Sequence, residues 1–308
     1  MGACESQLPL FAELVSTSLT PQIALCDPTR VRARPFIKWV GGKNRLLARL
    51  APLLPPNVGS RRYFEPFAGG GALFFSRPWR SAVLADVNAS LVRTYRAVRD
   101  SVETVIAMLE GFERLHDADL YYRTRQRFNE GLSDDSELAA TFIYLNRTCF
   151  NGLYRENRKG EFNVPVGAYE RPKILDANCL RTASEALRGA ELRAGDFDAW
   201  VDEVGAGDFV YCDPPYVPAS ETARFSQYAR GGFSPADQER LRDAFVAMAA
   251  RGAYVMLSNS DTPKVRELYR GWPMVRLLAP RSVSCRGGSR RPIGELVIRS
   301  YGVGELAF

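Results

Sequence analysis

The residues in this sequence whose types and spacing are best suited to chemistry are Asp213-Pro214-Pro215-Tyr216. They follow an apolar run over 208–212 that predicts a buried strand. Because prolines lack an N–H and fix φ, this 213–216 turn presents the Asp213 carboxylate and the Pro214 carbonyl as acceptors. Two acceptors can draw on both hydrogens of an exocyclic NH2 and make its nitrogen nucleophilic, while Tyr216 stacks on the base. The turn is therefore a candidate site for chemistry on an aromatic amine; the alternative is a proline-terminated surface turn.

A second feature is the glycine turn, Gly69-Gly70-Gly71, which lets the backbone approach a ligand without intervening side chains. It is not a dinucleotide fingerprint, because Phe74 stands where the third glycine of that motif would be. Asp86 ends the next apolar run, where a carboxylate can hold the diol of a ribose. Each feature alone also fits a tight turn or a helix cap. Together with the 213–216 turn, they favour a nucleoside cofactor beside an amine acceptor.

The elements that must position these residues alternate between strand and helix. Helical periodicity fills the stretch from Leu91 to Phe112, and Ser234 followed by Pro235 predicts the start of another helix. We therefore expect an α/β fold with a doubly wound, mostly parallel sheet that binds ligands at the carboxyl ends of its strands. The apolar runs that predict strands lie at 63–67, 82–86, 191–193, 208–212, 253–257 and 295–299.

Two further segments carry polar side chains suited to a partner. Residues 146–163 interleave polar, aromatic and basic side chains, which is typical of a loop or hairpin that contacts something. A Gly/Ser-rich segment contains spaced arginines that are predicted to bind phosphates, and the alternative is a solvated charge run. These arginines are Arg281, Arg286, Arg290 and Arg291. Residues 1–34 have mixed composition and form an extension to which we assign no chemistry.

The composition is that of a globular protein with an ordinary core. The 308 residues include 41 Lys and Arg against 35 Asp and Glu, and the net charge of +6 is compatible with a polyanionic partner. The 6 cysteines are scattered and histidine occurs once, so we expect no Cys/His metal site and reduced, intracellular thiols. No apolar run approaches the roughly 20 residues of a membrane span. We expect a cytoplasmic protein with no membrane or metal partner, monomeric in solution.

Several motifs, in one order from about residue 34 to the end, resemble the Dam-type DNA adenine N6-methyltransferases (class alpha, D12 family). This resemblance implies an enzyme that uses S-adenosylmethionine to methylate the N6 amine of adenine in double-stranded DNA. It also implies a Rossmann-like methyltransferase fold with a seven-stranded sheet and an inserted target-recognition domain, helical with a β-hairpin. The motifs are KWVGGK at 38–43, EPFAGGG at 65–71, LADVN at 84–88, NGLYR at 151–155, GEFNVP at 160–165 and DPPY at 213–216.

The resemblance also implies roles for individual residues and boundaries for the domains. The catalytic residues would be Asp213, Pro214, Pro215 and Tyr216. Cofactor binding would fall to Trp39, Lys43, Phe67, Gly69, Gly71, Asp86, Asp196, Phe197 and Asp213. Residues 35–90 and 176–308 would form the catalytic domain, and 91–175 the recognition domain that interrupts it.

For DNA, the resemblance implies that Lys38 contacts the first guanine of the site and Arg155 a guanine on the other side. An arginine fork matches O6 and N7 of guanine. Leu153 and Pro165 would pack against a thymine. Phe150 would fill the gap left by a flipped adenine, although Phe lacks the hydroxyl of the Tyr found in many relatives. The remaining predicted DNA contacts are Asn151, Tyr169, Arg281, Arg286 and Arg290.

The expected target is the adenine of GATC, and a longer site beginning GAT stays open. Two other classes of function also stay open. One is a DNA-binding protein with a degenerate cofactor pocket, which the complete 213–216 turn and Asp86 disfavour. The other is a methyltransferase acting on RNA or on a small amine, and the aromatic and basic segment 146–165 disfavours a small substrate.

Overall fold

We describe the fold from a computed structural model, which defines residues 33–216, 233–279 and 293–302. The predicted N-terminal extension lies almost entirely outside these residues, as do the four arginines between Arg281 and Arg291.

A seven-stranded sheet forms the centre of the fold, in the order β3-β2-β1-β4-β5-β7-β6. The strands are β1 (Arg62–Glu65), β2 (Ser81–Asp86), β3 (Ala190–Ala194), β4 (Phe209–Cys212), β5 (Tyr254–Ser260), β6 (Met274–Ala279) and β7 (Ile293–Arg299). Neighbours among β1 to β5 run parallel, whereas β7 is antiparallel to both β5 and β6. The predicted doubly wound, mostly parallel seven-stranded sheet is therefore confirmed.

Several helices begin at a residue whose side chain caps the first turn. The side chains of Asn88, Asp117, Asp134 and Asp176 each accept a backbone N–H at a helix start. The α-helices are α1 (Leu47–Leu50), α2 (Ala72–Phe75), α3 (Ala89–Asp100), α4 (Val102–Leu115), α5 (Ala118–Glu130), α6 (Asp135–Thr148), α7 (Ala177–Leu187), α9 (Pro235–Ala250) and α10 (Pro263–Leu268). Short 3-10 helices are η1 (Lys43–Arg45), η2 (Ala51–Leu53), η3 (Val58–Ser60), η4 (Phe150–Gly152) and η5 (Phe197–Glu203).

The structure differs from the sequence prediction in three elements. The periodic stretch from Leu91 to Phe112 is two helices, because Ser101 leaves helical geometry with φ −141° and ends α3. Strand β6 was not predicted, since it is an edge strand in which Arg276 interrupts the apolar run. Strand β5 continues past the predicted end at residue 257 through Ser258, Asn259 and Ser260, which are polar and yet buried.

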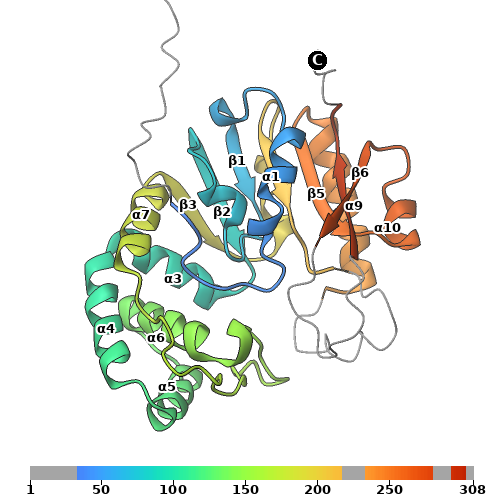
Figure 1. Ribbon diagram of the computed structural model, residues 1–308. Coiled ribbons are helices and arrows are strands. Elements are labelled where there is room, and N and C mark those ends of the chain that lie inside the picture. Colours follow the sequence, from blue (N-terminus) through green and yellow to red (C-terminus); the bar gives the residue numbers. More distant parts are fainter. Residues whose placement is uncertain (1–32, 217–232, 280–292, 303–308) are drawn as a thin grey trace, which may run out of the picture. The chain divides into compact units, whose positions relative to one another are not determined.

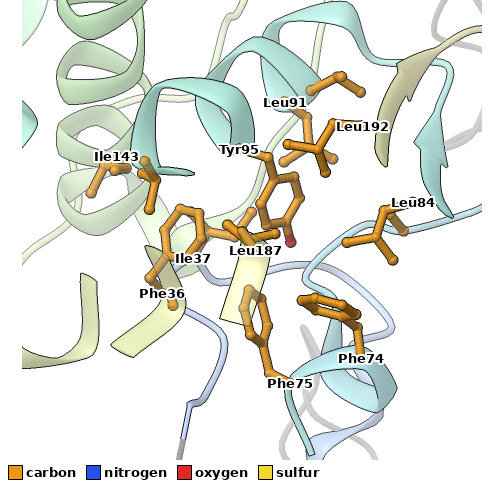
Figure 2. Packing of buried hydrophobic residues seen from close by; sticks show 14 of the residues in the cluster. Phe36, Ile37, Phe74, Phe75, Leu84, Leu91, Tyr95, Ile143, Leu187 and Leu192 are labelled. Carbon is orange, nitrogen blue, oxygen red and sulfur yellow. The ribbon is translucent and has the colours of Figure 1, made fainter. Parts of the chain in front are cut away.

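Hydrophobic cores cover both faces of the sheet. Adjacent residues of β1 point to opposite sides, so Tyr63 belongs to one core and Phe64 to the other. Figure 2 shows part of the larger core, where Tyr95 of α3 lies among Phe36, Phe75 and Leu91. The Tyr95 hydroxyl donates to the carbonyl of Gly69 at 2.8 Å, so this core also fixes the glycine turn.

Helices α3 to α6 pack on one another in a helical layer at the β3-β2 side of the sheet (Figure 1). Helix α3 contacts both of these strands and also α6, so it joins the helical layer to the sheet. Helix α6 is buried along almost its whole length, and Phe142, Ile143 and Tyr144 are each at most 2% exposed. After α6 the chain passes into the segment 149–166, which carries five of the ten predicted DNA contacts.

Candidate active site

Asp213 follows β4 directly and forms an ion pair with Lys43, a residue 170 positions away in sequence. The Lys43 ammonium lies 2.6 Å from Oδ1 and 2.7 Å from Oδ2 of Asp213. It also donates to the carbonyl of Gly41 at 2.7 Å and lies 4.8 Å from the centre of the Tyr216 ring. The structure therefore joins the motif KWVGGK of the sequence analysis to the 213–216 turn.

Two features of the surroundings of Asp213, its burial and the nearby Lys43 ammonium, have opposite effects on its pKa. Burial raises the pKa of the Asp213 carboxyl above its ordinary value, and the adjacent Lys43 ammonium lowers it. Lys43 itself is 4% exposed, so its charge is little screened by water. The ion pair thus favours an ionised Asp213, the form that accepts hydrogen bonds from an amine.

Two polar residues that the sequence prediction missed support the 213–216 turn from behind. Gln238 of α9 donates to the carbonyl of Pro215 at 3.2 Å, and its own side-chain oxygen accepts from Asn259 of β5 at 3.0 Å. Gln238 and Asn259 are 2% and 0% exposed. Buried amides of this kind hold a backbone in place only when both are satisfied. The polar run at the end of β5 was the available sequence signal for Asn259.

Asp86 connects the end of β2 to the glycine turn. Its Oδ2 accepts from the N–H of Gly69 and its Oδ1 from the N–H of Asn88, both at 2.9 Å. Burial raises the pKa of Asp86, and these two N–H donors oppose that shift. A carboxylate has about four lone-pair positions, so Asp86 can still accept from a ribose hydroxyl. Gly69 and Gly71 have positive φ, 47° and 65°, a conformation in which glycine avoids the strain of a side chain.

Trp39 packs directly on the glycine turn. A Cβ at Gly69 would lie 2.6 Å from Cδ1 of the Trp39 ring, so only glycine leaves room for it. The Trp39 ring also stacks on two other rings, with 5.6 Å between its centroid and that of Tyr154 and 6.5 Å to that of Phe142. Trp39 therefore touches both the predicted cofactor turn and the predicted recognition segment.

The remaining predicted cofactor residues lie around two stacked rings. Phe67 stacks on Phe197 with centroids 5.4 Å apart. The Arg240 guanidinium lies 4.9 Å from the centre of the Phe197 ring and forms an ion pair with Asp196 at 2.9 Å. Asp196 is thus engaged by a cation from α9, which the sequence prediction did not include.

Two further carboxyls are buried close to these residues. Glu65 at the end of β1 is 3% exposed and Glu295 of β7 is 5% exposed. Within the described residues, Glu65 Oε2 and Glu295 Oε1 have no hydrogen-bond partner. Burial raises the pKa of Glu65 to about 8 and raises that of Glu295, where the Lys43 ammonium opposes the shift.

Seven of the ten predicted DNA contacts lie within the described residues, and several of these seven are exposed. Lys38 and Asn151 are exposed, Phe150 is 50% exposed and Tyr169 is 38% exposed. The Lys38 ammonium lies 5.0 Å from the centre of the Tyr169 ring. Asn151 has a left-handed backbone, φ 57°, which turns the chain sharply between Phe150 and Leu153.

The predicted hairpin is present as a tight reversal held by isolated antiparallel bridges, Glu156 with Phe162 and Cys149 with Val166. The N–H of Phe150 donates to the carbonyl of Pro165 at 2.9 Å. The Arg155 side chain donates to Asn163 at 2.9 Å and is exposed. The segments 150–155 and 160–165 are therefore adjacent, as a shared contact surface requires.

The described part of the chain has neither a membrane-spanning helix nor a metal site. None of its helices combines the length and apolar character needed to cross a membrane. Nor do its His, Cys, Asp and Glu side chains gather into a group of 3 or more that could hold a metal ion.

Comparison with known proteins identifies the family. A family model described as D12 class N6 adenine-specific DNA methyltransferase matches residues 39–281. The type II methyltransferase M1.LlaDCHI of Lactococcus lactis subsp. cremoris is 41% identical, over 90% of this chain and 99% of that protein. The type II methyltransferase M.MjaIII of Methanocaldococcus jannaschii is 37% identical, over 88% of this chain and 100% of that protein. The DNA adenine methylase of Escherichia coli K12 is 35% identical, over 86% of this chain and 94% of that protein.

The resemblance seen in the sequence motifs is thus confirmed over most of the chain. Such a family implies a DNA substrate and S-adenosylmethionine as methyl donor. The chain belongs to the D12 class N6 adenine-specific DNA methyltransferases and is a DNA adenine N6-methyltransferase.

Proposed function

We propose that this methyltransferase modifies the adenine of GATC in double-stranded DNA, after rotating that adenine out of the helix into the 213–216 turn. The observation that carries the proposal is the Asp213 carboxylate, held at the end of β4 by the buried Lys43 ammonium at 2.6 Å. A fixed carboxylate beside a proline carbonyl offers an acceptor for each hydrogen of one exocyclic amine.

In the proposed mechanism, Asp213 and Pro214 accept the N6 hydrogens and orient the nitrogen lone pair, while Tyr216 stacks on the adenine ring. When bound, S-adenosylmethionine supplies a methyl group that its sulfonium already activates. Gln238 and Asn259 keep the turn rigid, so the acceptors are in position before the base arrives.

The cofactor would lie against the glycine turn and the carboxyl ends of β1, β2 and β4. Asp86 would bind the ribose diol, and Trp39, Lys43, Phe67, Gly69, Gly71 and Asp213 would line the pocket. Asp196 and Phe197 would contact the adenine of the cofactor. The Asp86 carboxylate supports this placement, because it already accepts from the N–H of Gly69 in the glycine turn.

The segment 91–175 would act as the recognition domain, inserted between the two catalytic parts 35–90 and 176–308, in an enzyme that is monomeric in solution. Phe150 is half exposed beside Asn151 and is suited to fill the gap left by a flipped adenine. Lys38 and Arg155 would read guanines, and Leu153 and Pro165 a thymine. Asn151, Tyr169, Arg281, Arg286 and Arg290 would complete the DNA contacts.

GATC is supported by the relatives named DNA adenine methylase, such as that of Escherichia coli K12. A longer site beginning GAT is a second candidate, since the same residues that read GAT would serve both. An enzyme for this longer site would carry out the same methyl transfer to adenine N6 and would differ only in its contacts to the outer bases.

The test is to incubate the purified protein and S-adenosylmethionine with unmethylated genomic DNA and to map N6-methyladenine at single-base resolution. Methylation of essentially every GATC, and little elsewhere, is the expected result. The control variant Asp213→Ala should lose transfer by a factor of at least about 10² while it still binds duplex DNA. Methylation confined to a longer motif would refute GATC. Transfer to RNA alone would refute the DNA substrate, and failure to bind the cofactor would refute the cofactor assignment.

A further inference from the structure

Asn146 of α6 holds the backbone of Lys38 on both sides. Its Oδ1 accepts from the N–H of Lys38 and its Nδ2 donates to the carbonyl of Lys38, both at 2.8 Å. The same Nδ2 lies 3.4 Å from the carbonyl of Gly152. Asn146 is 1% exposed, so these bonds do not compete with water. This amide clamp joins two segments that are 108 residues apart and that both belong to the predicted DNA surface.

The Lys38 side chain is then guided across a glycine. Gly152 has φ 62°, and a Cβ at this position would collide with the Lys38 stem. Beyond Gly152, the Lys38 ammonium lies over the Tyr169 ring at 5.0 Å. Tyr169 in turn packs on Gly167, where a Cβ would collide with its ring. The path of the Lys38 side chain is therefore set from its backbone to its charged end.

A second amide clamp of the same geometry holds the other predicted reading segment. Asn129 of α5 accepts from the N–H of Phe162 at 2.8 Å and donates to the carbonyl of Phe162 at 3.0 Å. Phe162 precedes Asn163, which accepts from Arg155. Helices α5 and α6 thus each fix one DNA-facing segment through one asparagine. Only an amide has both a donor and an acceptor in this fork, so aspartate cannot replace it.

We propose that Asn146 is a positioning residue for base selection, which sets the Lys38 ammonium against its guanine without touching DNA. Asn129 does the same for Arg155, by holding the segment whose Asn163 accepts from the Arg155 side chain. The proposal rests on the proposed function, because it needs a DNA substrate with a defined site. It predicts that each clamp controls discrimination at its own base pair and not at the others.

The experiment measures methylation of oligonucleotide duplexes that carry GATC or one single-base change, by wild type, Lys38→Ala, Asn146→Asp and Asn129→Asp. Asn146→Asp should lose discrimination at the base pair that Lys38→Ala also relaxes, by about tenfold, the factor expected for one lost base contact. Asn129→Asp is the matched control and should relax a different base pair. Equal loss at all positions in both variants would overturn the proposal, as would wild-type selectivity in Asn146→Asp or in Lys38→Ala.

A double variant tests the route of the effect. If Asn146 acts through Lys38, then Asn146→Asp combined with Lys38→Ala discriminates as poorly as Lys38→Ala alone. Additive losses would contradict that route.

Should Asn146→Asp fail to fold, as judged by thermal unfolding, Gly152→Ala displaces the Lys38 stem while it leaves the Asn146 clamp intact. It should produce the same selective loss, and unchanged selectivity in Gly152→Ala would refute the proposal. Wild-type protein that methylates no duplex at all would instead contradict the proposed function.

Discussion

At the scale of single residues, the charge of Asp213 depends on one buried cation. Burial alone raises the pKa of the Asp213 carboxyl and would favour its protonated form, which accepts a hydrogen bond from an amine less well than the carboxylate does. Lys43 opposes this shift from 2.6 Å away. The same ammonium also opposes the rise that burial causes in the pKa of Glu295, so Lys43 acts on two buried carboxyls. Its removal should therefore be visible in the pH dependence of catalysis.

Replacing Lys43 by Met should shift the acid limb of the kcat profile to higher pH, by about one unit or more. The sign follows because the pKa of Asp213 rises further once the ammonium is gone, so a higher pH is needed to ionise it. The measurement is kcat against pH at saturating cofactor. Lys264→Met, which removes an exposed ammonium paired with Glu239 at 3.1 Å, is the matched control and should leave the profile unchanged. An unshifted acid limb in Lys43→Met would contradict this role.

At the scale of secondary structure, the 213–216 turn is supported by neighbouring elements that the chain reaches much later. Helix α9 supplies Gln238 from its first turn, and β5 supplies Asn259. The start of α9 is secured by a capping box, in which Ser234 accepts from the N–H of Asp237 and the Asp237 side chain accepts from the N–H of Ser234. The cap lies four residues before Gln238, so fraying of α9 would release the carbonyl of Pro215.

Ser234→Ala should lower the free energy of unfolding by about 1 kcal/mol, because it removes the acceptor for the Asp237 N–H. It should also lower kcat modestly, since the first turn of α9 then holds Gln238 less firmly. Denaturant unfolding and steady-state kinetics give the two quantities. Ser234→Thr retains the hydroxyl and should behave like wild type. A Ser234→Ala protein with the same free energy of unfolding as wild type would show that the cap adds nothing to the packing of α9.

At the scale of the whole molecule, a net charge of +6 coexists with several carboxyls sealed inside the protein. The positive balance assists binding to a polyanion such as DNA. The buried carboxyls have a different effect: they make the free energy of unfolding depend on pH. Glu65 contributes most clearly, because burial raises its pKa to about 8.

Wild-type protein should lose stability as the pH rises from about 4.5 to 8, relative to Glu65→Gln. In this range the folded protein keeps a proton on Glu65 that the unfolded chain has released, so the free energy of unfolding falls with pH. The stability that the protonated Glu65 contributes is fully present below its pKa in the unfolded chain. It is lost as the pH rises through its pKa in the folded protein. The difference between the two proteins should change by about 1.4 kcal/mol per pH unit. Urea unfolding at several pH values measures it.

The control for this experiment is Glu110→Gln, which changes an exposed glutamate of α4 and should follow the wild-type curve. Parallel curves for wild type and Glu65→Gln would mean that Glu65 is already ionised in the folded protein.

The sequence by itself determined the family, the alternation of strands and helices, and the positions of Asp213, Asp86 and the glycine turn at strand ends. These features depend on residues that are near one another in the chain, so that periodicity, turn chemistry and motif order reveal them. It could not separate α3 from α4, because both have the same apolar period and only the backbone at Ser101 divides them. It also missed β6, an edge strand whose apolar run is interrupted.

Only the tertiary structure decided which distant polar groups meet. Lys43 and Asp213 are 170 residues apart, Lys38 and Asn146 are 108 apart, and the turn at Pro215 depends on Gln238 and Asn259. The physical reason is that a buried donor or acceptor must find a partner wherever packing brings one, and local sequence does not specify where that is. Motifs in the sequence therefore determined which residues carry the chemistry, and packing determined which residues hold them in place.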